Sequence, residues 1–563
     1  MTSSDYHWNL PTPVPESINS NLDTFSPPFR SVLFRRGFMN SQDAVSFLLP
    51  QDPSFSEEVS LRHLELGCDL IKKTLEGKQA IAIFGDYDTD GITATALLTL
   101  ALRKIGGQIL PYIPNRFVDG YGLNMPAIDL LHEGGAKLLI TVDNGIRSND
   151  EVAYAKSLGM SVIITDHHLP LEIIPAADAI INPKVPGDPY PNKSLAGVGV
   201  VYKLICRLSS YYPSIKPEDY LDLVALGTIA DIVSLEGENR YLVKQGLIQI
   251  NQHRRQSLLS VIGAAGYLDQ KIYATDISFQ IAPRINSSGR LADVNHLVPL
   301  ELLLSSDPAE CGKHAQTLEI HNDRRKRMSR SMQKRIEEQF SPKDPLPPIL
   351  ISLDQDHDLG VAGITAGHLT RKYYLPAIVG AVGDETTTAS CRSIPEFDIS
   401  AALKSIKDLF TRFGGHKLAA GFTIENQNLP AFHEKMTLLA EKELSVLDLQ
   451  PTLEIDSVVK LSDLNSTLYQ ELLKLEPTGE GNPMPVFVVR GITAKKVSKV
   501  GKFGDHLKFL ADDGDNKIPA IAFSQGSSAS ALTGRFDLAC KFTENVFRGK
   551  REFQLQVVDI KPQ

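Results

Sequence analysis

The sequence has no apolar run long enough to cross a membrane. A spanning helix needs about 18 or more consecutive apolar residues, and the 563 residues contain no such stretch. The first residues, MTSSDYHWNL, lack the basic start and the apolar core of a secretory signal peptide. These two absences predict a cytoplasmic protein with no membrane partner.

Cysteine is scarce as well. The five cysteines lie far apart along the chain, at Cys68, Cys206, Cys311, Cys391 and Cys540. The lack of a CxxC pair argues against a thiolate metal site, and the wide spacing argues against a disulfide framework. A reduced setting therefore fits best, and a metal site in this chain would use oxygen and imidazole ligands.

An excess of positive charge is also missing, since the net charge at pH 7 is −9. This argues against a nucleic-acid coat of the histone type. A local basic channel can nevertheless lie on an acidic body, and acidic residues gathered around bound cations count as negative in the sum. Charge alone therefore leaves a nucleic-acid enzyme open.

Short apolar segments alternate with helical patterns over residues 56–305. The segments typical of buried strands are AIAIF, QILPYI, AKLLITV, MSVIIT and ADAIIN. Helical patterns such as ITATALLTLALRKIG and RSNDEVAYAKSLG separate them. Continuous apolar runs between helices are typical of a parallel sheet that is covered on both faces. We therefore predict an α/β domain with a doubly wound parallel sheet.

The rest of the chain divides into four further regions. Residues 1–55 form an arm rich in Pro, Ser and Asn, with a short helix at SQDAVSFLLP, and residues 306–345 form a long connecting helix and a proline-rich linker. Residues 346–447 are predicted to form a second, smaller α/β domain. Residues 448–563 contain short alternating strands at a spacing that predicts a small β-barrel of the OB type.

Acidic and imidazole side chains follow the predicted strands at their carboxyl ends. They are Asp86, Asp88 and Asp90 after AIAIF, Asp143 after LLITV, and Asp166, His167 and His168 after VIIT. In a doubly wound sheet these strand ends line one crevice, where ligands bind. A further carboxylate, Asp231, lies in the apolar segment YLDLVALGTIADIVSL, where it needs a cation or a hydrogen-bond donor.

Divalent cations would explain why three aspartates stand so close together. Alternate residues of an extended turn point the same way, so we expect Asp88 and Asp90 to reach one site, with Gly91 turning the chain into the next helix. Oxygen and imidazole ligands favour Mn²⁺ or Mg²⁺. Two such ions would support phosphoester hydrolysis. Taken singly, the motifs also fit a calcium loop, a strand-end cap or a surface histidine pair.

The order of these motifs resembles a known superfamily. With DYDTDG, VDNG, DHH and GTIAD in this order, the sequence resembles the DHH phosphoesterases. The stretches PNRFVDGYGLN, LAGVGVVYKL, APRINSSGRLAD, GVAGITAG and GGHKLAAGFTI are similar to those of the RecJ family, bacterial single-strand-specific 5′→3′ DNA exonucleases. This resemblance covers about residues 55–563. It implies a two-metal hydrolase that releases 5′-mononucleotides in recombination and repair.

The resemblance also implies roles for individual residues. The metal ligands would be Asp88, Asp90, Asp143, His167 and Asp231, with Asp143 bridging the two ions. The catalytic residues would be Asp86 in support, His168 at the scissile phosphate, and Arg392 and His416 as phosphate contacts. The DNA contacts would be Arg284, Asn286, Arg290, Gly414 and Gly415, with Phe547 and Arg548 of the barrel. Stacking aromatics with a positive groove are how single strands are bound.

Expectations for partners follow from the same resemblance. The substrate would be single-stranded DNA with a 5′ end, supplied by a RecQ-type helicase and a single-strand-binding protein, and the protein would be a monomer. One departure from the family pattern is visible, because W-H-x-G-V is replaced by DHDLGV, which puts Asp358 at the usual histidine position and His357 one place earlier. Any substrate role of that histidine is therefore open.

Two other functions remain as alternatives. One is a DHH phosphodiesterase of short oligoribonucleotides or cyclic dinucleotides, although such chains usually lack a C-terminal barrel. The other is a non-catalytic repair scaffold, although such proteins have lost metal ligands that this sequence retains.

Overall fold

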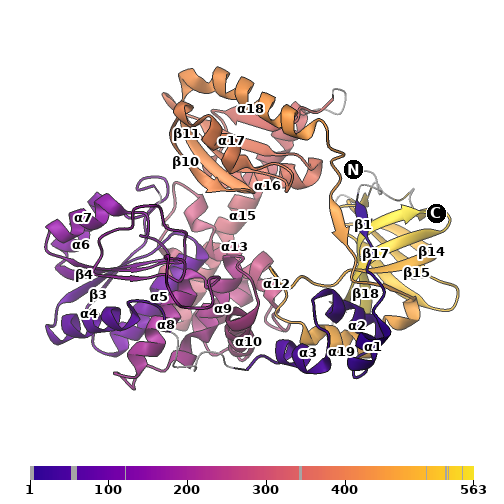
Figure 1. The fold of residues 1–563 in the computed structure, drawn as a ribbon, viewed down its shortest axis with the longest axis horizontal. Helices are drawn as coiled ribbons and strands as arrows, with labels where there is room; N and C mark the ends of the chain where they lie inside the picture. Colours follow the sequence, from indigo (N-terminus) through magenta and orange to yellow (C-terminus); the bar gives the residue numbers. More distant parts are fainter. Residues whose placement is uncertain are drawn as a thin grey trace. The chain divides into compact units, whose positions relative to one another are not determined.

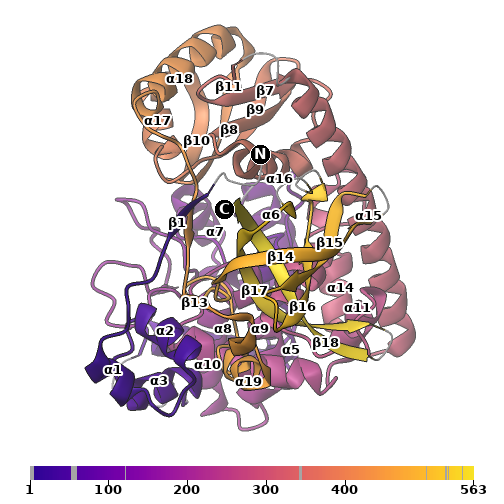
Figure 2. The same ribbon diagram turned by 90° about the vertical axis from the view of Figure 1, so that its right-hand side faces the viewer.

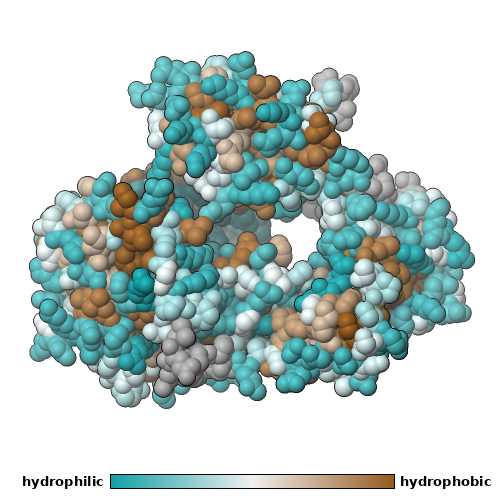
Figure 3. Space-filling model, in the orientation of Figure 1, coloured by the Kyte–Doolittle hydropathy of each residue, from teal (hydrophilic) through white to brown (hydrophobic). Residues whose placement is uncertain are grey.

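The computed structural model describes residues 6–51, 60–120, 122–340, 345–501, 504–526, 529, 532–547 and 550–563 (Figure 1). The chain divides into two compact units. One unit contains residues 50–326 and 476–483, and the other contains residues 1–49, 327–475 and 484–563. Among the described helices, none is long and apolar enough to cross a membrane. Hydrophilic residues cover most of the surface that Figure 3 shows, with apolar residues in small patches.

The first unit is built on a five-stranded parallel sheet. Its strands are β2 (Ala80–Phe84), β3 (Ile109–Tyr112), β4 (Ala136–Val142), β5 (Ser161–Thr165) and β6 (Ala179–Ile181). They lie in the order β3-β2-β4-β5-β6, and every neighbouring pair is parallel. The chain therefore runs from β2 to β3 on one side and then returns to β4 on the other side. This is the doubly wound topology that the sequence predicts.

Helices cover both faces of this sheet. In β2, Ile81 and Ile83 belong to one apolar core, whereas Ala82 and Phe84 belong to another. The covering helices are α4 (Leu64–Glu76), α5 (Thr89–Lys104), α6 (Met125–Glu133), α7 (Asn149–Ser157) and α8 (Gly197–Ser209). Figure 1 shows α6 and α7 over one face and α4, α5 and α8 over the other. The continuous apolar strands follow from this double burial.

The described part of the chain after residue 190 adds only helices to this unit. They include α9 (Leu221–Ala230), α10 (Gly237–Asn251), α11 (Gln256–Ala264), α14 (Val298–Leu304) and short turns between residues 274 and 290. Buried Leu and Val side chains of α9 pack in the same core as α5 and α8. The long helix α15 (Pro308–Gln339) confirms the helix predicted after residue 306.

The second unit contains a mixed sheet over residues 350–425. Its strands are β7 (Leu350–Asp354), β8 (Ala377–Val382), β9 (Thr386–Arg392), β10 (Phe410–His416) and β11 (Ala419–Glu425). The order is β10-β11-β9-β8-β7, and only β7 and β8 pair in parallel. The helices α16 (Leu359–Tyr373), α17 (Ile399–Ser405) and α18 (Leu429–Leu444) accompany it. This is the smaller α/β domain of the prediction.

Five C-terminal strands close into a barrel (Figure 2). They are β14 (Phe487–Val500), β15 (His506–Asp512), β16 (Lys517–Ala522), β17 (Phe536–Phe547) and β18 (Lys550–Pro562). The pairing of β14 with β17 completes the ring, and β13 (Ser457–Val459) adds to β14 on its outside. The OB-type barrel is therefore confirmed, although the sequence analysis omits β17.

The described N-terminal residues form ordered elements that pack on the barrel. They are β1 (His7–Asn9), α1 (Glu16–Asn21), α2 (Pro27–Arg35) and α3 (Ser41–Leu48). Strand β1 pairs with β12 (Thr452–Glu454), and Phe29 and Leu33 join the core that contains Leu468 of α19 (Ser466–Lys474). The helix expected at SQDAVSFLLP is α3, but the rest of the arm is more regular than predicted.

Candidate active site

The predicted acidic residues gather where the strand order reverses. Strands β2 and β4 are neighbours, and the connections that leave them run in opposite directions. Asp86, Asp88 and Asp90 follow β2, Asp143 follows β4, and His167 and His168 follow β5. The carboxyl ends of strands at such a switch point are the usual ligand site of an open α/β sheet.

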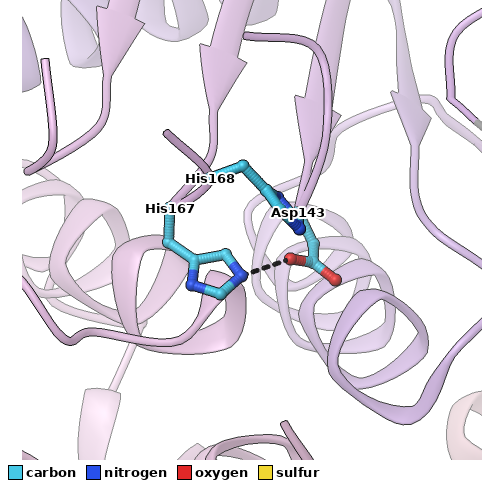
Figure 4. Close-up of side chains that lie close together, drawn as sticks. All are labelled: Asp143, His167 and His168. Atoms are coloured by element: carbon cyan, nitrogen blue, oxygen red, sulfur yellow. Dashed lines mark ion pairs between the residues drawn. The ribbon is translucent and has the colours of Figure 1, made fainter. Parts of the chain in front are cut away.

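Three overlapping groups of side chains have the geometry to hold a metal ion. They are Asp86, Asp88 and Asp143; Asp143, His167 and His168; and Asp90, His167 and Asp231; in each group the potential ligand atoms lie within 4.8 Å of one another. His167 Nε2 is 3.1 Å from Asp143 Oδ1 and 3.6 Å from Asp231 Oδ2. Figure 4 shows the first of these contacts, with His168 beside it. Asp143 and His167 link the groups.

The local conformation of the three aspartates differs from the extended turn that we expect. Helix α5 begins at Thr89, so Asp90 lies in its first turn, and Asp88 is the N-cap residue that accepts a hydrogen bond of 3.0 Å from Gly91 N. Asp88 groups with Asp86, whereas Asp90 groups with Asp231. The backbone here is therefore not the extended turn that we expect, because N-capping starts the helix at Thr89. Asp88 and Asp90 belong to different groups of one overlapping cluster, and their joint role as ligands stays a prediction.

Asp90 is held by the start of another helix. Its Oδ2 accepts a hydrogen bond of 2.6 Å from Gly197 N, and its Oδ1 accepts one of 2.9 Å from Val198 N. These N–H groups begin α8, where free amides and the helix dipole favour an anion. Gly197 is a site residue that the sequence analysis misses. A Cβ at this position would lie 2.6 Å from the Cβ of Asp143, so no larger residue fits unless the site shifts.

Asp143 has an unusual backbone. Its φ is +62°, in the left-handed region that non-glycine residues rarely adopt. Such a conformation costs of order 1–3 kcal/mol and is typical of functional sites. With this backbone conformation, the Asp143 carboxylate belongs to two of the three ligand groups described above.

Burial makes this collection of carboxylates costly. The pKa values of Asp86, Asp143 and Asp231 are raised well above the usual carboxyl range, first because burial disfavours the charged form and second because neighbouring aspartates repel it. The same causes raise the pKa of Asp90 to about 7. Burial lowers the pKa of His167 to about 3. A bound divalent cation would offset the cost of burying the carboxylates and the repulsion between them.

Several donor atoms of the site have no hydrogen-bond partner among the described residues. They are Asp143 Oδ1, Asp231 Oδ2 and both ring nitrogens of His167, all buried. His167 Nε2 approaches the two carboxylate oxygens at 3.1 and 3.6 Å without forming a hydrogen bond to either. Buried polar atoms normally have hydrogen-bond partners, so these four atoms suit the coordination of a cation. The set contains carboxylate oxygen and imidazole nitrogen without thiolate, which suits Mn²⁺ or Mg²⁺.

Asp166 shapes the turn that carries the two histidines. Its Oδ1 accepts hydrogen bonds from His167 N at 2.7 Å and from His168 N at 2.9 Å, and it lies 2.8 Å from His168 Nδ1. Its Oδ2 accepts from Ile146 N at 3.0 Å. Burial raises the pKa of Asp166, but the hydrogen bond and charge of His168 outweigh burial and lower it to about 2. Asp166 therefore stays ionised and orients the His168 ring.

Arginine side chains add positive charge near the carboxylates of the candidate site. Burial, and then repulsion by Arg116 and Arg325, lowers the pKa of Arg290 to about 10. The Arg116 guanidinium lies 5.5 Å from the centre of the Tyr87 ring. The sequence analysis names Arg290 only, although Arg116 lies in its PNRFVDGYGLN motif. Positive charge concentrated beside Tyr87 suits a phosphate ligand.

The two other residues predicted in APRINSSGR make contacts within the protein. Arg284 is buried, pairs with Glu319 and donates to Gln280 O at 2.6 Å. Asn286 Oδ1 accepts from Thr89 Oγ1 at 2.8 Å, next to the N-cap of α5. Their contact with DNA stays a prediction.

The remaining predicted residues belong to the second unit. Arg392 ends β9 and donates from Nη1 to Cys391 O at 2.8 Å. Gly414, Gly415 and His416 lie exposed on β10, where Gly415 has φ +149°. Their roles, like that of Arg392, stay predictions. Arg548 and the side chain of Phe547 lie outside the described residues.

The departure at Asp358 has a structural explanation. Asp358 is the N-cap residue of α16 and accepts a hydrogen bond of 2.8 Å from Gly360 N. His357 is buried, its Nδ1 lies 3.1 Å from Gly380 O of β8, and burial lowers its pKa. In this chain His357 therefore packs inside its own domain.

Family models match three parts of the chain. The model of the DHH family N-terminal domain matches residues 80–228. The model of the DHHA1 domain matches residues 347–442, and that of the RecJ OB domain matches residues 455–559.

Relatives are similar over nearly the whole chain. The single-stranded-DNA-specific exonuclease RecJ of Bacillus subtilis (strain 168) is 32% identical over 99% of this chain and 71% of its own length. RecJ of Escherichia coli (strain K12) is 33% identical over 95% of this chain and 96% of its own length. The crystal structure of RecJ in complex with Mn²⁺ from Thermus thermophilus covers 99% of this chain and 80% of that chain, with a TM-score of 0.84 and 29% identity. The chain thus belongs to the RecJ family of single-stranded-DNA-specific exonucleases.

Proposed function

We propose that this chain degrades single-stranded DNA from its 5′ end, releases 5′-mononucleotides and uses two divalent ions, Mn²⁺ or Mg²⁺, in recombination and repair. The observation that carries the proposal is the buried set of potential metal ligands at the switch point. Four of its ligand atoms make no hydrogen bond within the described residues. The Thermus thermophilus RecJ structures with Mn²⁺ and with Mg²⁺ support the choice of ions.

The chain's own residues would divide the work as follows. Asp88, Asp90, Asp143, His167 and Asp231 hold the ions, and Asp86 supports them in the group that it shares with Asp88 and Asp143. When bound, the ions supply activation of water and neutralisation of charge on the phosphate. This leaves the protein with positioning and with electrostatic stabilisation of the transition state.

Positive side chains would hold the substrate. Asp166 orients the His168 ring through the contact of 2.8 Å with its Nδ1, and His168 would contact the scissile phosphate. Arg116 and Arg325 both repel Arg290 and lower its pKa, so the phosphates of a DNA strand would offset positive charge around Arg290. Arg392 and His416 would add contacts from the DHHA1 domain, and the OB barrel would bind the strand by stacking and charge.

The proposal extends to setting and partners. We expect a cytoplasmic monomer that receives its substrate from a RecQ-type helicase and a single-strand-binding protein. The family membership supports the substrate, and pull-down with each partner would test the rest.

The test is digestion of a single-stranded DNA oligomer labelled at either end, beside duplex DNA and RNA, with and without Mn²⁺ or Mg²⁺. We expect metal-dependent release of mononucleotides from the 5′ end. Asp143→Ala should abolish it, whereas Asp178→Ala should not, because Asp178 forms an exposed pair with Lys156 at the other end of the sheet. Release from the 3′ end would contradict the polarity. Turnover of short RNA or cyclic dinucleotides alone would contradict the substrate.

A further inference from the structure

Two loops carry the groups that surround the candidate metal site. The segment of residues 194–198 leads into α8 and supplies the Gly197 and Val198 N–H groups to Asp90, and Gly197 packs against Asp143. The loop of residues 231–236 begins with Asp231 and separates α9 from α10. Asp90 lies on α5 and Asp231 is the C-cap of α9, and these two helices pack in one core. A contact that ties the two loops together adds a second constraint on the position of Asp231 relative to Asp90.

One buried side chain joins the two loops. Asn239, in the first turn of α10, is 1% exposed. Its Nδ2 donates to Ser194 O at 2.6 Å and to Ser234 O at 2.9 Å. Both hydrogens of a single amide group are thus used, one on each loop. The site lies within one compact unit, since all of these residues belong to residues 50–326.

Neighbouring contacts fix the Asn239 side chain in turn. Asn192 Nδ2 donates to Asn239 Oδ1 at 3.3 Å, and Asn192 Oδ1 accepts from Ser194 N at 3.0 Å. The adjacent Glu238 is buried in an ion pair of 2.9 Å with Lys203 and accepts from Tyr190 Oη at 2.7 Å. The start of α10 is therefore rigid, and the amide has little freedom to find other partners.

We propose that Asn239 is a positioning residue of the metal centre, which holds Asp231 at the distance from Asp90 and Asp143 that two divalent ions require. It touches neither the substrate nor a ligand carboxylate, and it acts through Ser194 and Ser234. Groups that hydrogen-bond directly to metal ligands typically change metal affinity by 10- to 100-fold when they are removed. Asn239 acts one contact further out, so we expect an effect at the lower end of this range. This inference rests on the proposed metal role of Asp90, Asp143 and Asp231.

The chain offers a matched control on the same helix. Asn251 ends α10, and its Nδ2 also donates to two main-chain carbonyls, Leu247 O at 2.7 Å and Ile272 O at 2.9 Å. Neither of these carbonyls lies on a loop of the site. Loss of an asparagine that bonds two carbonyls can thus be compared at both ends of one helix.

The experiment measures Mn²⁺ binding to the full chain by isothermal titration calorimetry, together with thermal unfolding and exonuclease kinetics. We expect Asn239→Ala to weaken Mn²⁺ binding at least tenfold, and Asn251→Ala to leave it within twofold although it also lowers the melting temperature. Asn239→Asp should fail like the alanine variant, because a carboxylate cannot donate to either carbonyl. Saturating Mn²⁺ should restore much of kcat in Asn239→Ala, with KM for DNA unchanged.

Three results would overturn the inference, each in a different way. Wild-type Mn²⁺ affinity in a folded Asn239→Ala chain would refute the positioning role and leave the proposed function intact. A wild-type chain that binds no Mn²⁺ and no Mg²⁺ would refute the metal centre itself. Equal loss of affinity in Asn239→Ala and Asn251→Ala would show general destabilisation of α10 in place of positioning.

Discussion

Gly197 packs so closely against Asp143 that a larger residue at position 197 would displace the Asp143 carboxylate. A Cβ at Gly197 would lie 2.6 Å from both the Cβ and Oδ1 of Asp143, whereas a Cβ at Gly199 would first meet Leu195 Cδ2 at 3.1 Å. We predict that Gly197→Ala weakens Mn²⁺ binding and lowers exonuclease activity at least tenfold. Gly199→Ala, on the same helix, should change both less than threefold. Calorimetry and end-labelled DNA digestion check this, and equal effects of the two variants would contradict it.

The arginine group predicts a salt effect at the residue scale. Each phosphate contact on single-stranded DNA contributes a slope of about −0.7 to the dependence of log affinity on log salt concentration. We predict that Arg116→Gln reduces the steepness of this slope by about 0.7. The Arg116 guanidinium lies 5.5 Å from the centre of the Tyr87 ring and repels Arg290, so it would contact one phosphate of the bound strand. Arg103→Gln, in the exposed last turn of α5, is the control. An unchanged slope in Arg116→Gln, measured by fluorescence anisotropy, would remove Arg116 from the DNA interface.

The sequence predicts the candidate metal ligands better than it predicts the residues that hold those ligands in position. Asp143 and His167 are visible because polar residues after apolar strands are a local pattern. The hydrogen bonds from Gly197 to Asp90 and from Asn239 to Ser194 join residues that are 107 and 45 positions apart. No local pattern encodes such a contact, so Gly197 and Asn239 become visible only in the folded chain.

At the scale of elements, a buried arginine fixes a segment that lies far away in the sequence. Arg240 of α10 is fully buried and donates to Glu476 O and Pro477 O, each at 3.2 Å. Leu235 N donates to Glu480 O at 2.9 Å. The segment Glu476–Pro483 thus belongs to the unit of the parallel sheet, although its neighbours in sequence belong to the other unit.

We predict that Arg240→Ala destabilises this unit by about 3 kcal/mol, because it removes the Arg240 hydrogen bonds to Glu476 O and Pro477 O together with a large buried side chain. Pro477 O keeps a donor, Asn482 Nδ2, at 2.7 Å. Protease cleavage within residues 476–483 should become faster. Arg207→Ala is the control, since Arg207 forms a half-exposed pair with Glu65 that contributes at most about 1 kcal/mol. Urea unfolding measures both. A loss below about 1 kcal/mol in Arg240→Ala would contradict the anchoring role.

Elements with a strong periodic pattern are predicted correctly, and weaker ones are missed. The strands β2, β4 and β5 are apolar throughout because both faces of their sheet are buried. Strand β17 is an exception, since it is missed although Phe536, Leu538, Cys540 and Phe542 lie at every second position and in the barrel core. Of the described N-terminal helices, α3 is predicted, whereas α1 and α2 are missed because the surrounding Pro and Ser residues hide the spacing of Phe29 and Leu33 on α2.

At the scale of the whole molecule, the two compact units differ in how they should respond to metal. All residues of the three candidate ligand groups lie in residues 50–326. A ligand that binds only the folded state stabilises it by about 2.7 kcal/mol at 100 times its dissociation constant. Metal binding therefore raises the free energy of opening chiefly in the cooperative unit that contains the site.

We therefore predict that Mn²⁺ slows amide hydrogen exchange in peptides from residues 60–326 and in the segment Glu476–Pro483, which shares their unit. Peptides from α2 and from the barrel strands β14 to β18 should change little, because they hold no residue of the site. Asp143→Ala should abolish the slowing everywhere, which separates binding at the site from binding elsewhere. Equal slowing in both units of the wild-type chain would instead show that metal binding is coupled to the barrel, and the two units would then act as one.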